Sequence, residues 1–286
     1  MYLLRLDKSM LRCINFFLLV FITAGCGSNA GTPANIVYQP IGIAHDTLIT
    51  NTAKVIHVLV ALCDNKNQGI VPVPVRIGNG QDPAANLYWG CAGGVKGFLK
   101  RKSSPWQLVK TIRQPAVNIY ERCVFKHRVS NAWLVADAYD GAAIRQCTVD
   151  FFTAAAGSKN EVLQVDSNRI AIGGSANIVA YTGHNGLMDF SLQQCPAQQN
   201  KALRETIILA CMSKRFFNEG IRKAGASPLL WSTGLMSPEA YTLEAAVEGW
   251  LLQETPQQIR MRAAKAYDQY QHCGIKAASN LLVTGW

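Results

Sequence analysis

Residues 206–211, Thr-Ile-Ile-Leu-Ala-Cys, form an apolar run that ends in a cysteine, and residues 177–182, Asn-Ile-Val-Ala-Tyr-Thr, lead directly into Gly183-His184-Asn185-Gly186. Short continuous runs of this kind predict strands that are buried on both faces, as in parallel sheets. The carboxyl ends of parallel strands are where α/β proteins place their chemistry. We therefore expect His184 and Cys211 to lie at neighbouring strand ends, where they can act as base and nucleophile.

The rest of the chain repeats the alternation of strand and helix. Further short apolar runs over 55–63, 132–138 and 228–233 predict strands, and helical spacing is found over 86–100, 141–156, 213–224, 238–253 and 255–272. Ser237 is the expected N-cap of the helix that starts with Pro238. The pattern predicts an α/β fold, a three-layer α/β/α sandwich with a mostly parallel sheet, in a single domain over 51–286.

The first residues resemble an export signal. Arg5, Lys8 and Arg12 supply positive charge ahead of a short apolar stretch over 16–22. Thr23-Ala24-Gly25-Cys26 is similar to the bacterial lipobox, which implies a signal peptide over 1–25, a lipidated Cys26 and a tether over 26–50. The alternative is an ordinary cleaved signal with an incidental cysteine. A lipoprotein of this kind is expected in the bacterial cell envelope, anchored to a membrane through its N-terminal lipid, and Gly27 is compatible with the outer membrane.

Charge and cysteine content narrow the classes of partner. Without residues 1–25 the chain holds 25 basic and 17 acidic residues, and its tightest basic cluster is Lys100-Arg101-Lys102. No aromatic residues interleave with that cluster, so we expect no nucleic-acid binding.

Seven cysteines remain beyond Cys26, an odd number, so at least one is expected to be free. Their spacing shows no zinc pattern, and no metal or organic cofactor is implied.

The surroundings of the two candidate residues suit thiol chemistry. Gly183 and Gly186 flank His184 and allow the backbone to turn sharply there. Cys211 precedes a predicted helix that starts near Ser213, with Lys214 and Arg215 close by in sequence. A helix N-terminus and nearby cations both lower a thiol pKa, so we expect an activated cysteine. Taken singly, Cys211 also fits a buried core thiol and His184 a turn histidine.

These motifs resemble the cysteine peptidases of the caspase and haemoglobinase fold, especially the legumain and GPI transamidase branch. The stretch 181–186 looks like the histidine motif of the transamidase, and Leu209-Ala210-Cys211 looks like the nucleophile strand. The run 58–65 resembles the first strand of legumain-like enzymes, so Asp64 or Asn65 is implied to orient His184. Asn185 stands where the family has glycine, and Leu209 replaces an acidic residue, so asparagine specificity is not implied.

The resemblance implies a cysteine endopeptidase or transpeptidase acting on a peptide or protein substrate. Cys211 is then the nucleophile, His184 the general base and acid, and Asp64 the orienting group. Amides near Asn185 and Cys211 would hold the oxyanion, while Asn185, Gly186, Ser232 and Thr233 would line the pocket. Asp189 and Phe190 are expected only to begin the following loop. The alternatives are a catalytically silent relative that binds a peptide or envelope component, and a structural envelope lipoprotein that meets an anionic polymer.

Overall fold

The centre of the fold is the apolar strand β1 (Lys54–Ala61), which pairs in parallel with strands on both sides in a computed structural model that describes residues 49–286. Its neighbours are β4 (Ala132–Tyr139) and β7 (Ile178–Thr182), and β7 continues in parallel to β8 (Glu205–Leu209) and β9 (Ser227–Ser232). The five strands coincide with the five predicted apolar runs, so this prediction is confirmed.

Antiparallel strands complete the sheet at both edges. A long hairpin of β2 (Trp106–Ala116) and β3 (Ile119–His127) pairs with β4, and the short β10 (Leu282–Val283) pairs with β9. The sheet has eight strands in the order β10-β9-β8-β7-β1-β4-β3-β2. A separate hairpin is formed by β5 (Glu161–Val165) and β6 (Asn168–Ile172). The described part of the chain is thus an α/β fold with a mixed, mostly parallel sheet.

Five of the six helices of residues 49–286 lie within predicted ranges, with two corrections, and the sixth, α6 (Ile275–Leu281), was not predicted. The helices are α1 (Val95–Leu99), α2 (Ile144–Ala155), α3 (Ser213–Ala224), α4 (Ala240–Leu251), α5 (Pro256–Gln271) and α6, with 3₁₀ turns η2 (Gly141–Ala143), η3 (Gly173–Ser175) and η4 (Gly186–Met188). The helix predicted over 86–100 exists only as α1, because the Asn86 side chain bonds both backbone groups of Cys63 and organises its own segment as turns. Ser237 is not an N-cap, since α4 begins after Glu239 and the Ser237 hydroxyl donates to Gln271.

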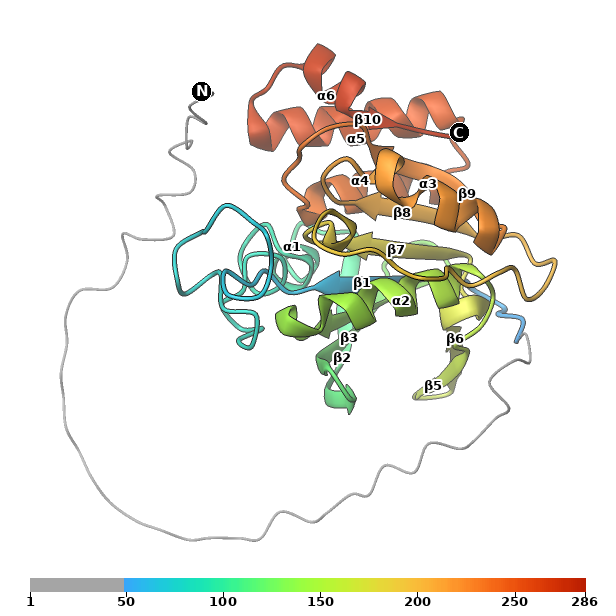
Figure 1. Cartoon of the computed structure of the whole chain (residues 1–286). Helices are drawn as coiled ribbons and strands as arrows, with labels where there is room; N and C mark the ends of the chain where they lie inside the picture. The colour runs from blue at the N-terminus through green and yellow to red at the C-terminus, as the bar shows by residue number, and fades with distance from the viewer. Residues whose placement is uncertain (1–48) are drawn as a thin grey trace, which may run out of the picture. The chain divides into compact units, whose positions relative to one another are not determined.

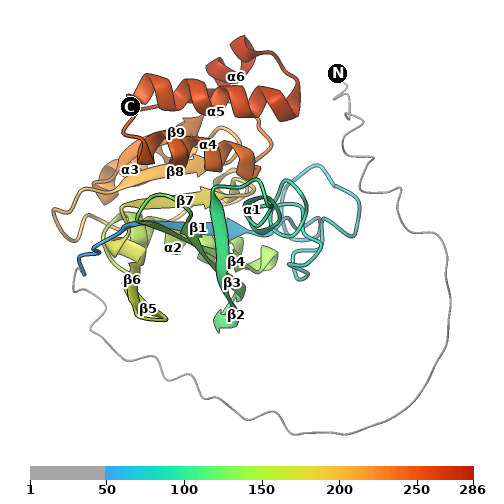
Figure 2. The same cartoon turned by 180° about the vertical axis from the view of Figure 1, so that it is seen from behind.

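Two apolar cores lie on opposite faces of the sheet. Alternate residues of β1 enter different cores, Val58 in one and Leu59 in the other. Helices α2 and α3 cover the Leu59 face, where their phenylalanines pack edge to face around Tyr181. Helices α1, α4 and α5 cover the Val58 face, which is best followed from behind (Figures 1 and 2). All described residues belong to one compact unit.

One ion-pair network is buried on the Leu59 side of the sheet. Arg122 on β3 forms two hydrogen bonds with Asp137 on β4, at 2.6 and 2.8 Å, and His57 on β1 approaches the same carboxylate at 3.1 Å. The side chains of Arg122 and Asp137 are 3% and 1% exposed. Burial raises the pKa of Asp137, but the Arg122 guanidinium outweighs it and holds that pKa well below its usual range. The network pins the antiparallel hairpin to the parallel core.

The predicted signal peptide, lipidated Cys26 and tether lie outside the described residues, apart from positions 49 and 50 at the end of the tether. Within residues 49–286, none of the helices has the length and apolar character that a membrane span requires.

Candidate functional site

His184 and Cys211 lie beyond the carboxyl ends of two strands that pair in parallel. In the register of β7 and β8, Thr182 is opposite Leu209, so both candidates come two residues after the last pair. The ladder continues for one further bond, from the Gly183 amide to the Leu209 carbonyl at 3.2 Å. The predicted placement of the pair at neighbouring strand ends is confirmed.

The Asn185 side chain ties the two strand ends together. Its Nδ2 donates to the Cys211 carbonyl at 2.6 Å, and its Oδ1 accepts from the Leu187 amide at 3.0 Å, which begins η4. Gly183 adopts a φ of +145°, and a Cβ atom there would lie 2.7 Å from the Ala61 carbonyl oxygen of β1. Only glycine is accommodated at this turn. The local sequence therefore fixes the backbone at both candidates.

Asp189 is the residue that contacts the histidine. The one-turn η4 brings the carboxylate back to His184, where Oδ2 lies 2.8 Å from Nε2. The same oxygen accepts from the Gly69 amide at 2.9 Å, and the Tyr181 hydroxyl donates to the His184 carbonyl at 2.7 Å. The His184 side chain is 7% exposed. A carboxylate that contacts an imidazole in this way fixes the orientation of the ring.

The prediction that Asp64 or Asn65 orients His184 is wrong. The Asp64 carboxylate accepts from the backbone of Lys66 and from the side chains of Asn67 and Gln81. Burial raises the pKa of Asp64, but these side-chain hydrogen bonds outweigh it and lower that pKa below the usual value. Asn65 bonds the backbone of Val73 instead. Both residues organise the loop that follows β1. The expectation that Asp189 only begins the following loop is also wrong, because Asp189 contacts His184.

The Cys211 thiol is held by the loop between β9 and α4. Its Sγ lies 3.5 Å from the Met236 carbonyl, as donor, and 3.4 Å from the Met236 amide, as acceptor. Burial raises the pKa of Cys211, against the smaller opposing effect of the Met236 hydrogen bond. The expected lowering is therefore wrong: Lys214 and Arg215 lie over the rings of Trp231 and Phe216. No hydrogen bond joins His184 to Cys211 among the bonds of the described residues.

The four predicted pocket residues have other roles. Ser232 is fully buried and bonded to the Ala210 carbonyl and to Ser213, beneath the site. Thr233 is exposed, but its hydroxyl donates to the Asn280 carbonyl at the end of α6. Asn185 is 0% exposed, and a Cβ atom on the buried Gly186 would lie 2.7 Å from the Phe190 ring. These residues support the strand ends rather than line an open pocket.

All seven cysteines of the described region are free of disulfides. In the same region, no group of three histidine, cysteine or acidic side chains is arranged to hold a metal ion. Burial raises the pKa of Cys63 and of Cys123 to about 12, so these two thiols are core residues without nucleophilic character at neutral pH.

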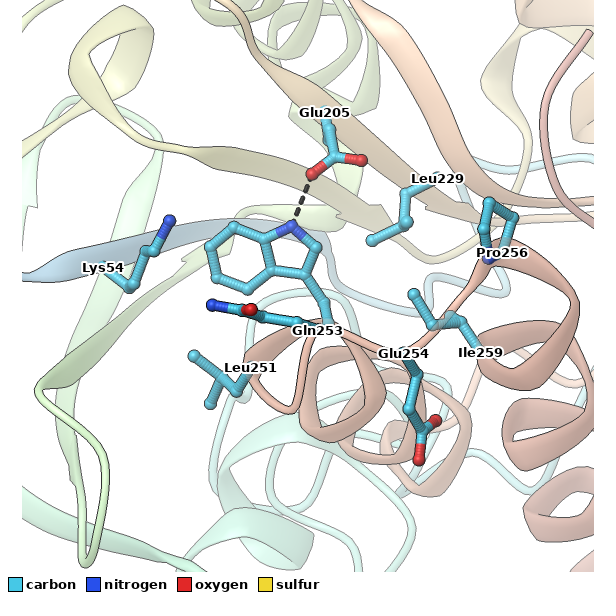
Figure 3. A pocket seen from close by; sticks show the side chains of 9 residues that line it. Lys54, Glu205, Leu229, Leu251, Gln253, Glu254, Pro256 and Ile259 are labelled. Carbon is cyan, nitrogen blue, oxygen red and sulfur yellow. Dashed lines mark hydrogen bonds between the residues drawn. The ribbon is translucent and has the colours of Figure 1, made fainter.

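A pocket of about 400 Å³ lies at the opposite, amino end of the sheet (Figure 3). The Trp250 indole N–H donates to Glu205, the first residue of β8, and the Lys54 ammonium lies 5.0 Å from the centre of the Trp250 ring. Glu254 is paired with Arg262. Because Cys211 follows the other end of β8, this pocket is separate from the candidate pair. Its lining is Lys54, Glu205, Leu229, Trp250, Leu251, Gln253, Glu254, Pro256 and Ile259.

Comparison of the chain with protein-family models, with curated proteins and with solved structures found no match. The site is therefore interpreted from its own geometry.

Proposed function

We propose that this protein is a cysteine-dependent acyl-transfer enzyme, a peptidase or transpeptidase with the three-layer α/β/α arrangement of the caspase and haemoglobinase fold. The observation that carries the proposal is the paired register of β7 and β8, which brings His184 and Cys211 to neighbouring strand ends, together with the hydrogen bond between the carboxylate of Asp189 and the imidazole. Nucleophile, base and orienting group are the parts that acyl transfer requires.

The reaction begins with transfer of the Cys211 proton to His184. The thiolate attacks the carbonyl carbon of a peptide bond, and His184 returns the proton to the departing amine, which leaves a thioester on Cys211. Water, or an amine in a transpeptidase, then attacks the thioester, loses its proton through His184 and restores the thiol. Asp189 stabilises the imidazolium in both halves. We assign the Cys211 amide, just before α3, as a donor to the oxyanion.

Activation requires the thiol to leave the Met236 backbone. In the resting arrangement the thiol is neutral, because burial raises the pKa of Cys211. Its hydrogen bonds go to Met236 rather than to the imidazole. A shift of the loop over 233–237, or a rotation of the cysteine side chain, is the step by which substrate binding would deliver the thiol to His184.

The same observations favour a second candidate function. A neutral thiol with backbone partners and no bond to histidine also suits a catalytically inactive relative that binds a peptide or an envelope component at this edge of the sheet. A third reading, a structural envelope lipoprotein, has no observation in the described residues that favours it.

We further propose that the protein is a lipoprotein, anchored in the bacterial cell envelope through Cys26. Its expected partner is a peptide or protein and not a nucleic acid. The support is the sequence similarity to a lipobox. Incorporation of an alkyne-bearing fatty acid into the full-length chain tests this. Loss of the label in Cys26→Ala is expected, and equal labelling of the variant would contradict the proposal.

The function is tested by alkylation of the full-length protein with an iodoacetamide probe between pH 5 and 9, with each labelled cysteine located by mass spectrometry. A panel of peptidyl acyloxymethyl ketones then reports on the acyl-transfer geometry, because these probes need a histidine-assisted thiolate. We expect a ketone probe to label Cys211, with the labelling lost in His184→Ala. Cys195→Ala is the matched control, since Cys195 is also a half-buried thiol with a raised pKa. A Cys211 that no ketone labels would favour the inactive relative.

A further inference from the structure

The loop that follows β1 contacts Asp189, the partner of His184. The Gly69 amide donates to the Asp189 oxygen that holds His184, so this loop and η4 share one hydrogen-bonded junction. In Figure 1 the loop lies at the end of the sheet toward which β1 runs. We call residues 71–75, Val-Pro-Val-Pro-Val, the platform segment.

The platform segment is held in place up to Pro74 and then enters a turn, in which the Ile77 and Gly78 amides donate to the Pro74 carbonyl at 3.0 and 3.1 Å. The Asn65 side chain bonds both backbone groups of Val73, donating to its carbonyl at 2.7 Å and accepting from its amide at 2.9 Å, as a neighbouring strand would. Pro72 and Pro74 fix their own φ angles and favour extended neighbours. A Cβ atom on Gly78 would lie 2.4 Å from Asn65 Nδ2, so that glycine keeps the clamp in place. Little conformational entropy remains to be lost when such a segment binds a partner.

Apolar side chains of this rigid segment face solvent. Val71 is 77% exposed and Val75 is 84% exposed, while Val73 between them packs against the core. Two more exposed apolar residues lie on the other loops of the site: Met188 precedes Asp189 and is 42% exposed, and Leu235 precedes Met236 and is 69% exposed. Single exposed valines are common, but rigid ones around a reactive pair point to a binding surface.

Two cations flank the platform segment. Lys66 and Arg76 are both exposed, and neither forms an ion pair within residues 49–286. The nearest carboxylates in the chain, Asp64 and Asp82, accept hydrogen bonds from their own loops, and neither forms an ion pair with Lys66 or Arg76 within residues 49–286. A partner that covers the valines would therefore meet positive charge from Arg76, directly after the segment, and from Lys66, next to Asn65, so an acidic side chain is favoured there.

We propose that the platform segment binds an extended peptide with aliphatic side chains and an adjacent acidic residue, and so selects the peptide that reaches Cys211. The inference deepens the proposed function and rests on it only for the later acyl transfer. Binding buries Val71 and Val75 against the aliphatic residues and places the acid beside Lys66 or Arg76. The platform offers exposed valines on a preorganised backbone, against which the aliphatic residues of an extended peptide can pack.

The test measures binding and acylation separately. Full-length protein with Cys211→Ala is titrated with three fluorescent peptides of equal length: aliphatic with one glutamate, aliphatic with one lysine, and serine-rich with one glutamate. Anisotropy gives each Kd. The double variant Val71→Asp, Val75→Asp is compared with Val117→Asp, Val129→Asp, whose valines are 87% and 91% exposed in the turns that flank β3. Circular dichroism checks that each variant is folded.

We expect the aliphatic glutamate peptide to bind best. The double variant Val71→Asp, Val75→Asp should weaken its binding about a hundredfold, equivalent to about 2.8 kcal/mol, while Val117→Asp, Val129→Asp should leave the Kd unchanged. Equal affinity for the three peptides, or equal losses in the two double variants, would overturn the inference. Ketone probes with the same sequences then test the function on unaltered Cys211. If the peptides bind selectively but no probe labels Cys211, the platform inference stands and the proposed enzymatic function is refuted. If the probes label Cys211 regardless of peptide sequence, the enzymatic function stands and the platform inference is refuted.

Discussion

Replacing Asn185 by alanine removes the side chain that joins the two strand ends of the site. The amide makes two hydrogen bonds, one to the Cys211 carbonyl and one from the Leu187 amide, and Asn185 is 0% exposed. Both hydrogen bonds are partly buried, so water replaces the lost partners only in part. A fully buried backbone group left without a partner costs about 1–3 kcal/mol, so two partly buried groups predict a loss of about 2–4 kcal/mol in the free energy of unfolding, the lower part of the summed range.

Urea denaturation followed by tryptophan fluorescence measures this loss. With a slope near 2 kcal/mol per molar urea, the midpoint should fall by about 1–2 M. The matched control is Asn218→Ala on α3, because Asn218 accepts one exposed hydrogen bond from Arg222 and its removal should cost less than about 0.5 kcal/mol. An equal midpoint for the two variants would refute the role given to Asn185. It would also remove the physical reason why Cys211 stays beside His184.

Three further changes test other parts of the structure. Arg122→Met leaves Asp137 buried without its guanidinium, so unfolding at pH 7 should cost about 3–5 kcal/mol less. The lowered pKa of Asp137 stabilises the original fold above the ordinary carboxyl pKa of 3.8, and this contribution is lost as the pH falls below that value, so urea titrations should show a smaller deficit at about pH 2 than at pH 7. A deficit that is the same at both pH values would contradict this. Asp189→Asn keeps an acceptor beside the imidazole but removes its charge, so labelling of the thiol by a ketone probe should slow by on the order of 10²-fold, and an unchanged rate would exclude a positioning role. Gly220→Ala on α3 would place a Cβ atom 2.3 Å from the fully buried Phe152 ring, so calorimetry should show a destabilisation of about 1–3 kcal/mol in place of the usual gain from alanine in a helix.

The sequence was most informative where burial is complete. The five parallel strands are mostly apolar because both faces of the sheet are covered. The hairpin of β2 and β3 was not predicted, because β2 is largely exposed and its many polar residues carry no continuous apolar run. The helix over 86–100 was predicted from spacing alone, whereas the Asn86 side chain competes with helical hydrogen bonds and imposes turns.

The candidate site was predicted in part. Strand ends follow from apolar runs, so His184 and Cys211 could be paired from the sequence. The partner of the histidine could not, because it depends on η4 turning Asp189 back by five residues. One signal was present: Asn185 followed by Gly186 favours a turn that reverses the chain. The protonation of Cys211 depends on burial by the 233–237 loop, which is distant in sequence and carries no motif.

The neutral state of Cys211 also affects how readily its thiol is oxidised. Peroxides oxidise thiolates far faster than thiols, and an oxidised cysteine cannot attack a carbonyl. The Cys211 thiol has a raised pKa and is hydrogen-bonded to the Met236 backbone, so it is protected from oxidation until the loop over 233–237 moves away. The leader sequence predicts an extracytoplasmic location. There, this protection would keep the Cys211 thiol reduced until a substrate binds, without a reducing system to restore it.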